Sequence, residues 1–407
     1  MTFGSSRVVC VRLHSVAVSL PASVPPRLRE IDWRWALPRI AVVFLITRLL
    51  VLSVAVAVET TQPPPPDGVR VDERPIITSL TSWDAEWYLS IAESGYHAEF
   101  GDFPDYAFFP AYPVTVRALG LLTGGDLAVA SVLASNLAFA LALVVLFALS
   151  MRYLTRERSI LSLWFLALAP GALAFTLSYS ESLFLLLATG AFLAAERRRA
   201  WVVGALLTVA AISRAPGILL VAPILLLYMQ RDGWRPTRDW LPLMLAPAAL
   251  LLYLGYLGWL TGDFLAPIHA QVHWDAFGGS VESAMAETGV SEAAEVTGTV
   301  ISGPVDILLN PLVAISLTSI AFYLFLFVYF RHDRITAPYW LVAITAVVGV
   351  LMAGRPYSIA RYFAVAWPFD WVLANRQSRI GRGVVLVVFA VGQAALAWLA
   401  FDWRLTP

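Results

Sequence analysis

The sequence contains no lysine, a single cysteine and few charged residues of either sign. Cys10 alone cannot form a disulfide, a cysteine metal site or a redox pair within one chain. Charged residues make up 14% of the chain and hydrophobic residues 59%, whereas soluble domains carry about 25% charged residues. The formal net charge is zero, which gives no support to binding of nucleic acid. A lipid bilayer is therefore the expected solvent, and the use of arginine alone indicates a GC-rich bacterial genome.

Long apolar runs recur along the sequence, and each predicts a membrane-spanning helix because an open strand cannot satisfy its backbone in lipid. The expected fold is an all-α polytopic membrane protein with about eleven transmembrane helices. The runs are roughly 37–58, 127–151, 159–177, 181–195, 200–213, 215–229, 240–260, 304–330, 336–353, 362–374 and 383–401. The segment 107–123 is apolar but contains Pro110, Pro113 and Arg117, which predicts a re-entrant or interfacial piece.

Arginines alternate between the predicted connections in a way that sets the orientation. Cytoplasmic loops carry an excess of basic residues, so we place the N-terminus inside and the C-terminus outside a plasma membrane. The basic residues on the cytoplasmic side are Arg27, Arg29, Arg34, Arg39, Arg152, Arg156, Arg158, Arg197, Arg198, Arg199, Arg231, Arg235, Arg238, Arg331, Arg334, Arg376, Arg379 and Arg382. The acidic loops 59–126 and 261–303 then lie outside, and loops of this length are usually functional or disordered.

The N-terminal stretch 1–36 is expected to be a cytoplasmic tail before the membrane domain, 37–407. Its segment 8–20 is weakly apolar but is interrupted by Arg12 and His14. A poor signal-peptide core and an over-extended gene start are the alternatives.

The first outer loop contains a predicted amphipathic helix that begins near Ser82. Trp83, Trp87 and Ile91 recur at helical spacing, which is typical of a helix lying on the outer leaflet. Asp84 near its start has two interpretations: it caps the N-terminus, or it is catalytic.

The other polar residues expected at the outer face are Glu181, Arg214, Arg355 and Arg361. An ionised group at membrane depth costs about 2.5–3.5 kcal/mol on insertion scales and usually faces a cavity or a partner. Ion pairs between Glu181 and arginine that only tie helices together are the alternative to a functional cluster. Arg48, midway along the first span, either reaches the interface or pairs inside the bundle.

Several segments, in order, resemble the PIG-V type of glycosylphosphatidylinositol mannosyltransferases. They are Trp83 to Leu89, Gly95-Tyr96, Phe108 to Pro113, Tyr179 to Phe184, Ser213 to Gly217, Ala270 to Trp274 and Arg361-Tyr362. The family hairpin reads Arg-Ser-Asn-Gly, and Pro216 replaces its Asn here. The order of the motifs over most of the chain is more specific than any one of them.

The resemblance implies a GT-C glycosyltransferase that takes a sugar, mannose in the family it resembles, from a polyprenyl phosphate donor and inverts the anomeric carbon. Acceptors of this class are lipid-linked glycans, glycolipids or proteins. The acid of the first family motif falls on Asp84, the expected base, with Glu86 as its competitor. The expected donor-phosphate residues are Arg214, Arg361 and Tyr362. The expected substrate-binding residues are Trp83, Trp87, Tyr179, Glu181, Gln271 and Trp274.

The residue types agree with this chemistry, since a carboxylate can deprotonate the acceptor and arginines can stabilise the departing phosphate. No glycine-rich phosphate loop is found, as expected without a nucleotide sugar. His269 and His273 have metal-ligand spacing, but the Glu of a His-Glu-x-x-His site is missing, so no metal is expected. The rivals are a lipid-linked-sugar flippase, which would place its polar site near the midplane, and a GT-C enzyme that uses another sugar.

Overall fold

The computed structural model describes residues 30–62, 70–98, 104–270, 337–353, 359–376 and 378–403, and these residues are helical with no strand among them. The first half contains α1 (Trp33–Thr61), α2 (Pro75–Leu80), α3 (Asp84–Ser94), η1 (Asp105–Ala107), α4 (Ala111–Gly120), α5 (Leu127–Ser150), α6 (Arg156–Leu168), η2 (Pro170–Phe175) and α7 (Glu181–Glu196). The second half contains α8 (Ala200–Ala211), η3 (Ala215–Leu220), α9 (Val221–Arg231), η4 (Arg238–Met244), α10 (Leu245–Thr261), α16 (Ala337–Ala353), α17 (Ile359–Ala364), α18 (Pro368–Arg376) and α19 (Arg379–Phe401).

Four of the described helical segments are long and apolar enough to cross a membrane: Trp33–Thr61, Leu127–Ser150, Arg238–Thr261 and Arg379–Phe401. They agree with the predicted spans 37–58, 127–151, 240–260 and 383–401. The spans 181–195, 200–213, 215–229 and 336–353 are also helical, as α7, α8, η3 with α9, and α16, but each continuous α-helix there is shorter. The span 304–330 lies outside the described residues. The chain is thus an all-α polytopic membrane protein.

Two predicted spans are wrong as continuous helices. The segment 159–177 breaks where α6 ends at Leu168 and Pro170 begins the 3₁₀ turn η2. Pro170 lacks a backbone N–H and cannot continue the α-helical hydrogen-bond ladder. The segment 362–374 breaks into α17 and α18, with Pro368 as the first residue of α18. Both breaks lie close to the residues that later form the candidate site, because η2 packs against α17.

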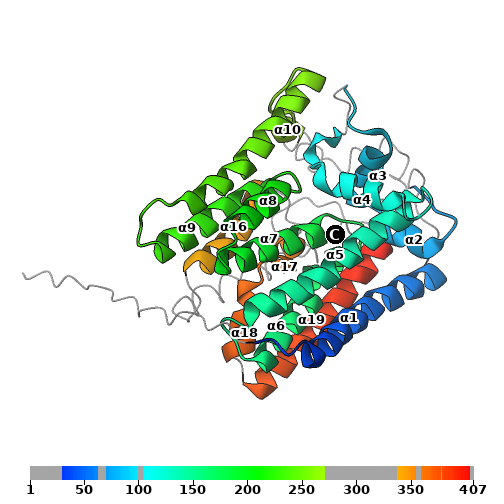
Figure 1. The fold of residues 1–407 in the computed structure, drawn as a ribbon. Helices are drawn as coiled ribbons and strands as arrows, with labels where there is room; N and C mark the ends of the chain where they lie inside the picture. Colours follow the sequence, from blue (N-terminus) through cyan, green and yellow to red (C-terminus); the bar gives the residue numbers. More distant parts are fainter. Residues whose placement is uncertain are drawn as a thin grey trace, which may run out of the picture.

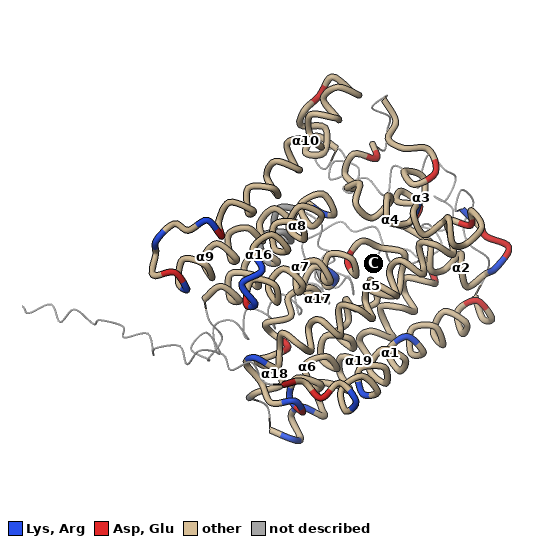
Figure 2. Tube along the Cα trace, viewed as in Figure 1, with Lys and Arg blue, Asp and Glu red and all other residues tan. Residues whose placement is uncertain are grey.

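The helices form a bundle in which segments far apart in sequence lie together. The first and last described helices, α1 and α19, pack side by side, and α5 packs against α7 (Figure 1). The shared core is aromatic and aliphatic, with Phe139 stacked on Phe175 at 4.6 Å between ring centroids. Charged residues lie mainly at helix ends and in connections, and α5 and α10 carry none along their length (Figure 2).

The outer-loop segment forms short helices that pack on the bundle. In α3 the buried apolar residues are Ala85, Tyr88, Leu89, Ile91 and Ala92, and Tyr88, Leu89 and Ala92 pack with residues of α4 and α5. Ile91 of the predicted face is buried, but Trp83 and Trp87 are only partly buried, so the buried face is centred on Tyr88 and Leu89. The apolar segment 107–123 is the short helix α4, whose Tyr112 is buried and hydrogen-bonds to α5 through the Ser131 carbonyl at 2.9 Å.

Candidate functional site

The two ends of α7 show where the charged groups of the bundle collect. At the last residue of α7, Glu196 pairs with Arg152 at 3.0 Å, and nearby Arg158 hydrogen-bonds Asn375. These contacts bring together the arginine-rich connections after α5, α7 and α18. Glu181 is the first residue of α7, about 22 Å away along the helix axis at 1.5 Å per residue. The candidate site lies at this opposite end.

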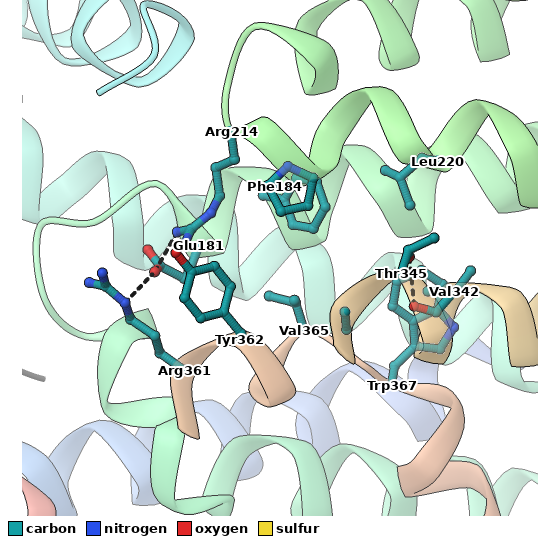
Figure 3. Close-up of a pocket in the computed structure, with 12 residues that line it drawn as sticks. Glu181, Phe184, Arg214, Leu220, Val342, Thr345, Arg361, Tyr362, Val365 and Trp367 are labelled. Atoms are coloured by element: carbon teal, nitrogen blue, oxygen red, sulfur yellow. Dashed lines mark hydrogen bonds and ion pairs between the residues drawn. The ribbon is translucent and has the colours of Figure 1, made fainter. Parts of the chain in front are cut away.

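Four charged side chains from four parts of the chain alternate in sign at this end. Asp84 Oδ2 lies 2.5 Å from Arg361 Nη1, and Arg361 Nε lies 3.6 Å from Glu181 Oε1. The same Glu181 oxygen pairs with Arg214 (Figure 3). Buried ions need partners because the loss of hydration costs several kcal/mol per ion. We call Asp84, Arg361, Glu181 and Arg214 the Asp84–Arg214 cluster. Each of its charges has at least one opposite charge beside it.

The hydroxyl groups of Ser180 and Tyr88 extend the Asp84–Arg214 cluster. Arg214 Nη1 also donates to Ser180 Oγ at 3.2 Å, and the Ser180 and Tyr88 hydroxyls are hydrogen-bonded at 2.7 Å. Ser180 and Tyr88 were not among the site residues predicted from sequence. Both lie inside the family motifs, which was the available signal.

Aromatic rings line both guanidinium groups. The Arg214 guanidinium lies over the Tyr362 ring at 5.2 Å, and the Arg361 guanidinium lies over the Tyr179 ring at 5.5 Å. These are cation–π distances, and such contacts hold a planar guanidinium in place without consuming its N–H donors. The predicted residues Tyr179, Glu181, Arg214, Arg361 and Tyr362 are thus brought together with Asp84.

Asp84 is directed into the cluster by a strained residue before it. Trp83 has a φ of 62°, which is uncommon for any residue other than glycine and costs of order 1–3 kcal/mol. Its indole N–H donates to the Ala400 carbonyl at 3.2 Å, and its ring lies 5.3 Å from that of Trp403. Trp83 is the N-cap of α3 and no side chain caps the helix, so the capping interpretation of Asp84 is wrong. Asp84 is the first helical residue and binds Arg361 instead.

Two glycines allow close backbone packing beside the segments that carry Arg361 and Arg214. A Cβ on Gly171 in η2 would lie 1.9 Å from the Ala360 carbonyl oxygen, directly before Arg361. A Cβ on Gly217 would lie 1.8 Å from the Ala210 carbonyl oxygen, and the Gly217 N–H donates to the Arg214 carbonyl at 2.8 Å. At both glycines the neighbouring backbone therefore lies too close for any residue with a side chain.

A small cavity opens beside the cluster. Its charged end is formed by Glu181, Arg214 and Arg361 with Tyr362 (Figure 3). The rest of its lining is mostly apolar, from α7, η3, α16 and the α17–α18 region: Phe184, Pro216, Leu220, Val342, Ala346, Val365 and Trp367, together with the hydroxyl of Thr345. This arrangement suits an amphiphile with an anionic group at one end.

Other predicted site residues lie elsewhere. Trp87 stacks on Phe108 at 5.9 Å, and burial raises the pKa of Glu86, whose nearest charged neighbour is Arg70. Gln271, Trp274 and His273 lie outside the described residues. His269 pairs with Asp263 at 2.6 Å, and no group of three His, Cys, Asp or Glu side chains that could hold a metal occurs in the described ranges.

Arg48 does not reach an interface. It is 4% exposed, its guanidinium lies 4.5 Å from the Phe139 ring centroid, and its nitrogens have no hydrogen-bond partner among the described residues. Neither of its predicted arrangements is observed.

Comparison with known proteins supports the motif analysis. A model of the family "Mannosyltransferase (PIG-V)" matches residues 40–232, which include Asp84, Glu181 and Arg214. Over these residues the chain is similar to the PIG-V mannosyltransferases. The resemblance is confirmed for that segment, while Gln271, Trp274, Arg361 and Tyr362 lie beyond it.

Curated relatives agree with the PIG-V match. GPI alpha-1,6-mannosyltransferase 2 of Mus musculus is 33% identical over 191 residues, and that of Homo sapiens is 33% identical over 169 residues. The alignments cover 44% and 39% of this chain, and only 38% and 33% of the mouse and human enzymes. The chain thus spans less than half the length of these relatives, so their activity applies here only as a proposal.

Solved structures with some likeness are archaeal oligosaccharyltransferases. Two structures of the Archaeoglobus fulgidus enzyme, one with Zn and sulfate and one tethered to an acceptor peptide, superpose with TM-scores of 0.45 and 0.46 at 13% identity. They cover 89% and 92% of this chain, and 52% and 56% of the archaeal chain. These TM-scores are too low to support a conclusion about fold or activity.

Proposed function

We propose that this protein is an integral membrane mannosyltransferase of the GT-C class. It moves mannose from a polyprenyl phosphate mannose to a hydroxyl of a lipid-linked glycan, a glycolipid or a protein, with inversion at the anomeric carbon. The observation that carries the proposal is the cluster in which Asp84 binds Arg361 and Glu181 joins Arg361 to Arg214, at the helix ends opposite the arginine-rich connections. The family match of residues 40–232 supports mannose as the sugar.

The orientation follows from the same geometry. Arginine-rich connections favour the cytoplasm, so the Asp84–Arg214 cluster at the other helix ends faces the extracytoplasmic side of the plasma membrane. A donor with a polyprenyl tail remains in the bilayer and presents its phosphate and sugar at that surface. The cavity beside the cluster combines a cationic end with an apolar lining, as an isoprenoid phosphate requires.

The chemistry needs one base and a site for the leaving group. The acceptor oxygen attacks the anomeric carbon as its proton passes to the Asp84 carboxylate, and the bond from that carbon to the phosphate oxygen breaks. The polyprenyl phosphate leaves with the electron pair and gains a negative charge. Arg214 and Arg361 stabilise this charge, because prepositioned guanidiniums at a partly dry site act strongly on developing charge. We propose that no metal takes part.

Transfer of radiolabelled mannose tests the proposal. Membranes or purified protein are incubated with polyprenyl phosphate mannose and a cell-envelope lipid extract, with excess chelator in a parallel reaction. We expect label in an acceptor in both reactions, and the stereochemistry of the new bond to be opposite to that of the donor. Transfer only from a nucleotide sugar, or movement of the intact lipid-linked sugar across vesicles without transfer, would contradict the proposal.

A further inference from the structure

Arg361 is shared by two acids, and these acids differ in their surroundings. The Asp84 side chain is 17% exposed, whereas that of Glu181 is 2% exposed. Glu181 pairs with Arg214 and lies beside the Nε edge of Arg361, and Figure 3 shows it between the two arginines. Among the described residues, the Asp84 side chain pairs with Arg361, at the Nη1 end. Glu181 is therefore the buried acid that holds both arginines, and Asp84 is the acid of the cluster that a ligand can reach.

The charges of the four side chains and of the donor phosphate stay balanced during the proposed transfer. Asp84, Glu181, Arg214 and Arg361 sum to zero. A phosphodiester donor adds one negative charge, and after transfer the phosphate carries a second one. The proton taken from the acceptor leaves Asp84 neutral at the same moment. The total charge of protein groups and phosphate thus stays constant through the transfer, while negative charge moves from Asp84 to the phosphate.

We propose that Arg361 is an exchangeable counter-ion that passes from Asp84 to the donor phosphate. This inference rests on the proposed function and deepens it. Before the donor arrives, Arg361 Nη1 is bound to Asp84 Oδ2, and this ion pair stabilises the charged carboxylate and makes it a weaker proton acceptor. A bound phosphate competes for the same N–H groups. The donor therefore binds first and frees the base, and the acceptor hydroxyl enters a site that is already competent.

The geometry permits this exchange without breaking the rest of the cluster. A guanidinium has five N–H donors in a planar fork, so the Nη edge can turn toward a phosphate while Nε remains near Glu181. The Tyr179 and Tyr362 rings, at 5.5 and 5.7 Å from the Arg361 guanidinium, keep cation–π contacts with it. Arg214 keeps its pair with Glu181 and is not bound to Asp84. Only one of the two arginines thus couples the base to the leaving group.

A binding experiment with farnesyl phosphate separates this coupling from general electrostatics. Affinity is measured in detergent for the purified full chain as wild type and as Asp84→Asn, Arg361→Gln, the double variant of these two, and Arg214→Gln. Asp84→Asn mimics the protonated base and releases Arg361, so we expect binding on the order of tenfold tighter. In the Arg361→Gln background the same change should have little effect, because the competition no longer exists. Glu93→Gln, on the same helix but paired with Arg70, is the control and should bind like wild type.

The outcomes distinguish the inference from the proposed function. An equal gain from Asp84→Asn in both backgrounds would show a simple long-range charge effect and would overturn the exchange. Unchanged affinity for Asp84→Asn, with binding lost in Arg361→Gln, would also overturn it while leaving the phosphate site intact. If wild type does not bind farnesyl phosphate at all, or if Arg361→Gln and Arg214→Gln bind it as well as wild type, the proposed function itself fails.

Discussion

Asp84 and Arg361 are separated by 277 positions in sequence, yet their side chains form an ion pair with 2.5 Å between Oδ2 and Nη1. Asp84 lies on α3 of the outer-loop segment, and Arg361 lies on the short helix α17 near the end of the chain. Their meeting depends on the packing of η2 against α17 and of Trp83 against α19. The predictions below test the parts of this arrangement separately.

Gly171→Ala should reduce transfer without touching a charged residue. The added Cβ would lie 1.9 Å from the Ala360 oxygen, so α17 must shift and carry Arg361 with it. Displacement of a reacting group by about 1 Å can cost about 100-fold in rate. The rate of mannose transfer is the measurement. Gly255→Ala, where nothing lies within 4 Å of the added Cβ, is the matched control and should be fully active. Wild-type transfer by Gly171→Ala would show that the position of α17 is not critical.

Arg214→Lys and Arg361→Lys should each lower transfer by at least about tenfold, although charge is retained. Lysine lacks the planar fork that can bind two phosphate oxygens at once. Steady-state rates at saturating donor, together with protein folding checked by gel filtration, measure the effect. Arg198→Lys, at the other end of the bundle, is the control. If both site variants transferred mannose at the wild-type rate, the phosphate role of these arginines would be wrong.

Glu86→Gln should stabilise the protein, and more so as pH rises. Burial raises the pKa of the Glu86 carboxyl above its usual value of 4.5, opposed by the backbone N–H and the charge of Arg70. A raised folded-state pKa means that the contribution of Glu86 to stability is complete at acid pH and is lost as pH rises through that pKa. The variant should therefore match wild type at acid pH and unfold at a higher Tm at neutral pH.

Thermal unfolding in detergent across this pH range measures the difference. Glu93→Gln is the comparison, because Glu93 pairs with Arg70 at 2.5 Å and its removal should give no gain at neutral pH. A Glu86→Gln variant with a lower Tm than wild type at neutral pH would show that its carboxylate is stabilising.

Ser94→Cys and Arg198→Cys should be labelled from opposite sides of the membrane. Both side chains are exposed; Ser94 ends α3, near the candidate site, and Arg198 follows α7 at the basic end. In a Cys10→Ser background, a membrane-impermeant thiol reagent added to intact cells should label only Ser94→Cys. Labelling of Arg198→Cys alone would invert the orientation and place the Asp84–Arg214 cluster in the cytoplasm.

Much of the fold could be predicted from the sequence because apolar runs and arginine placement are local signals. Long spans such as α5 and α19 agree with the prediction, and Pro170 and Pro368 explain the two that break. The buried face of α3 was predicted only in part, because Trp83, Trp87 and Ile91 are apolar at helical spacing while Tyr88, Leu89 and Ala92 are apolar as well. Tertiary packing against Tyr112 and the α5 helix decided between them.

The candidate site was predicted as a set of residues but not as a set of pairs. The loop pattern of arginines predicted Asp84, Glu181, Arg214 and Arg361 at one face of the bundle, and the motifs singled them out as site residues. Which acid binds which arginine depends on contacts that carry no sequence signature, such as the approach of Gly171 to Ala360. The roles of Ser180 and Tyr88 were missed for the same reason, since their hydrogen bond joins residues 92 positions apart.

The rate of mannose transfer by Asp84→Asn tests the central claim most directly, because the change keeps the side-chain shape and removes the proton acceptor. General base catalysis contributes typically about 10²–10⁴-fold. We expect a loss of this size in a variant that remains folded and inserted in the membrane, with Glu86→Gln assayed beside it. A fully active Asp84→Asn enzyme next to an inactive Glu86→Gln enzyme would contradict the account and assign the base to Glu86.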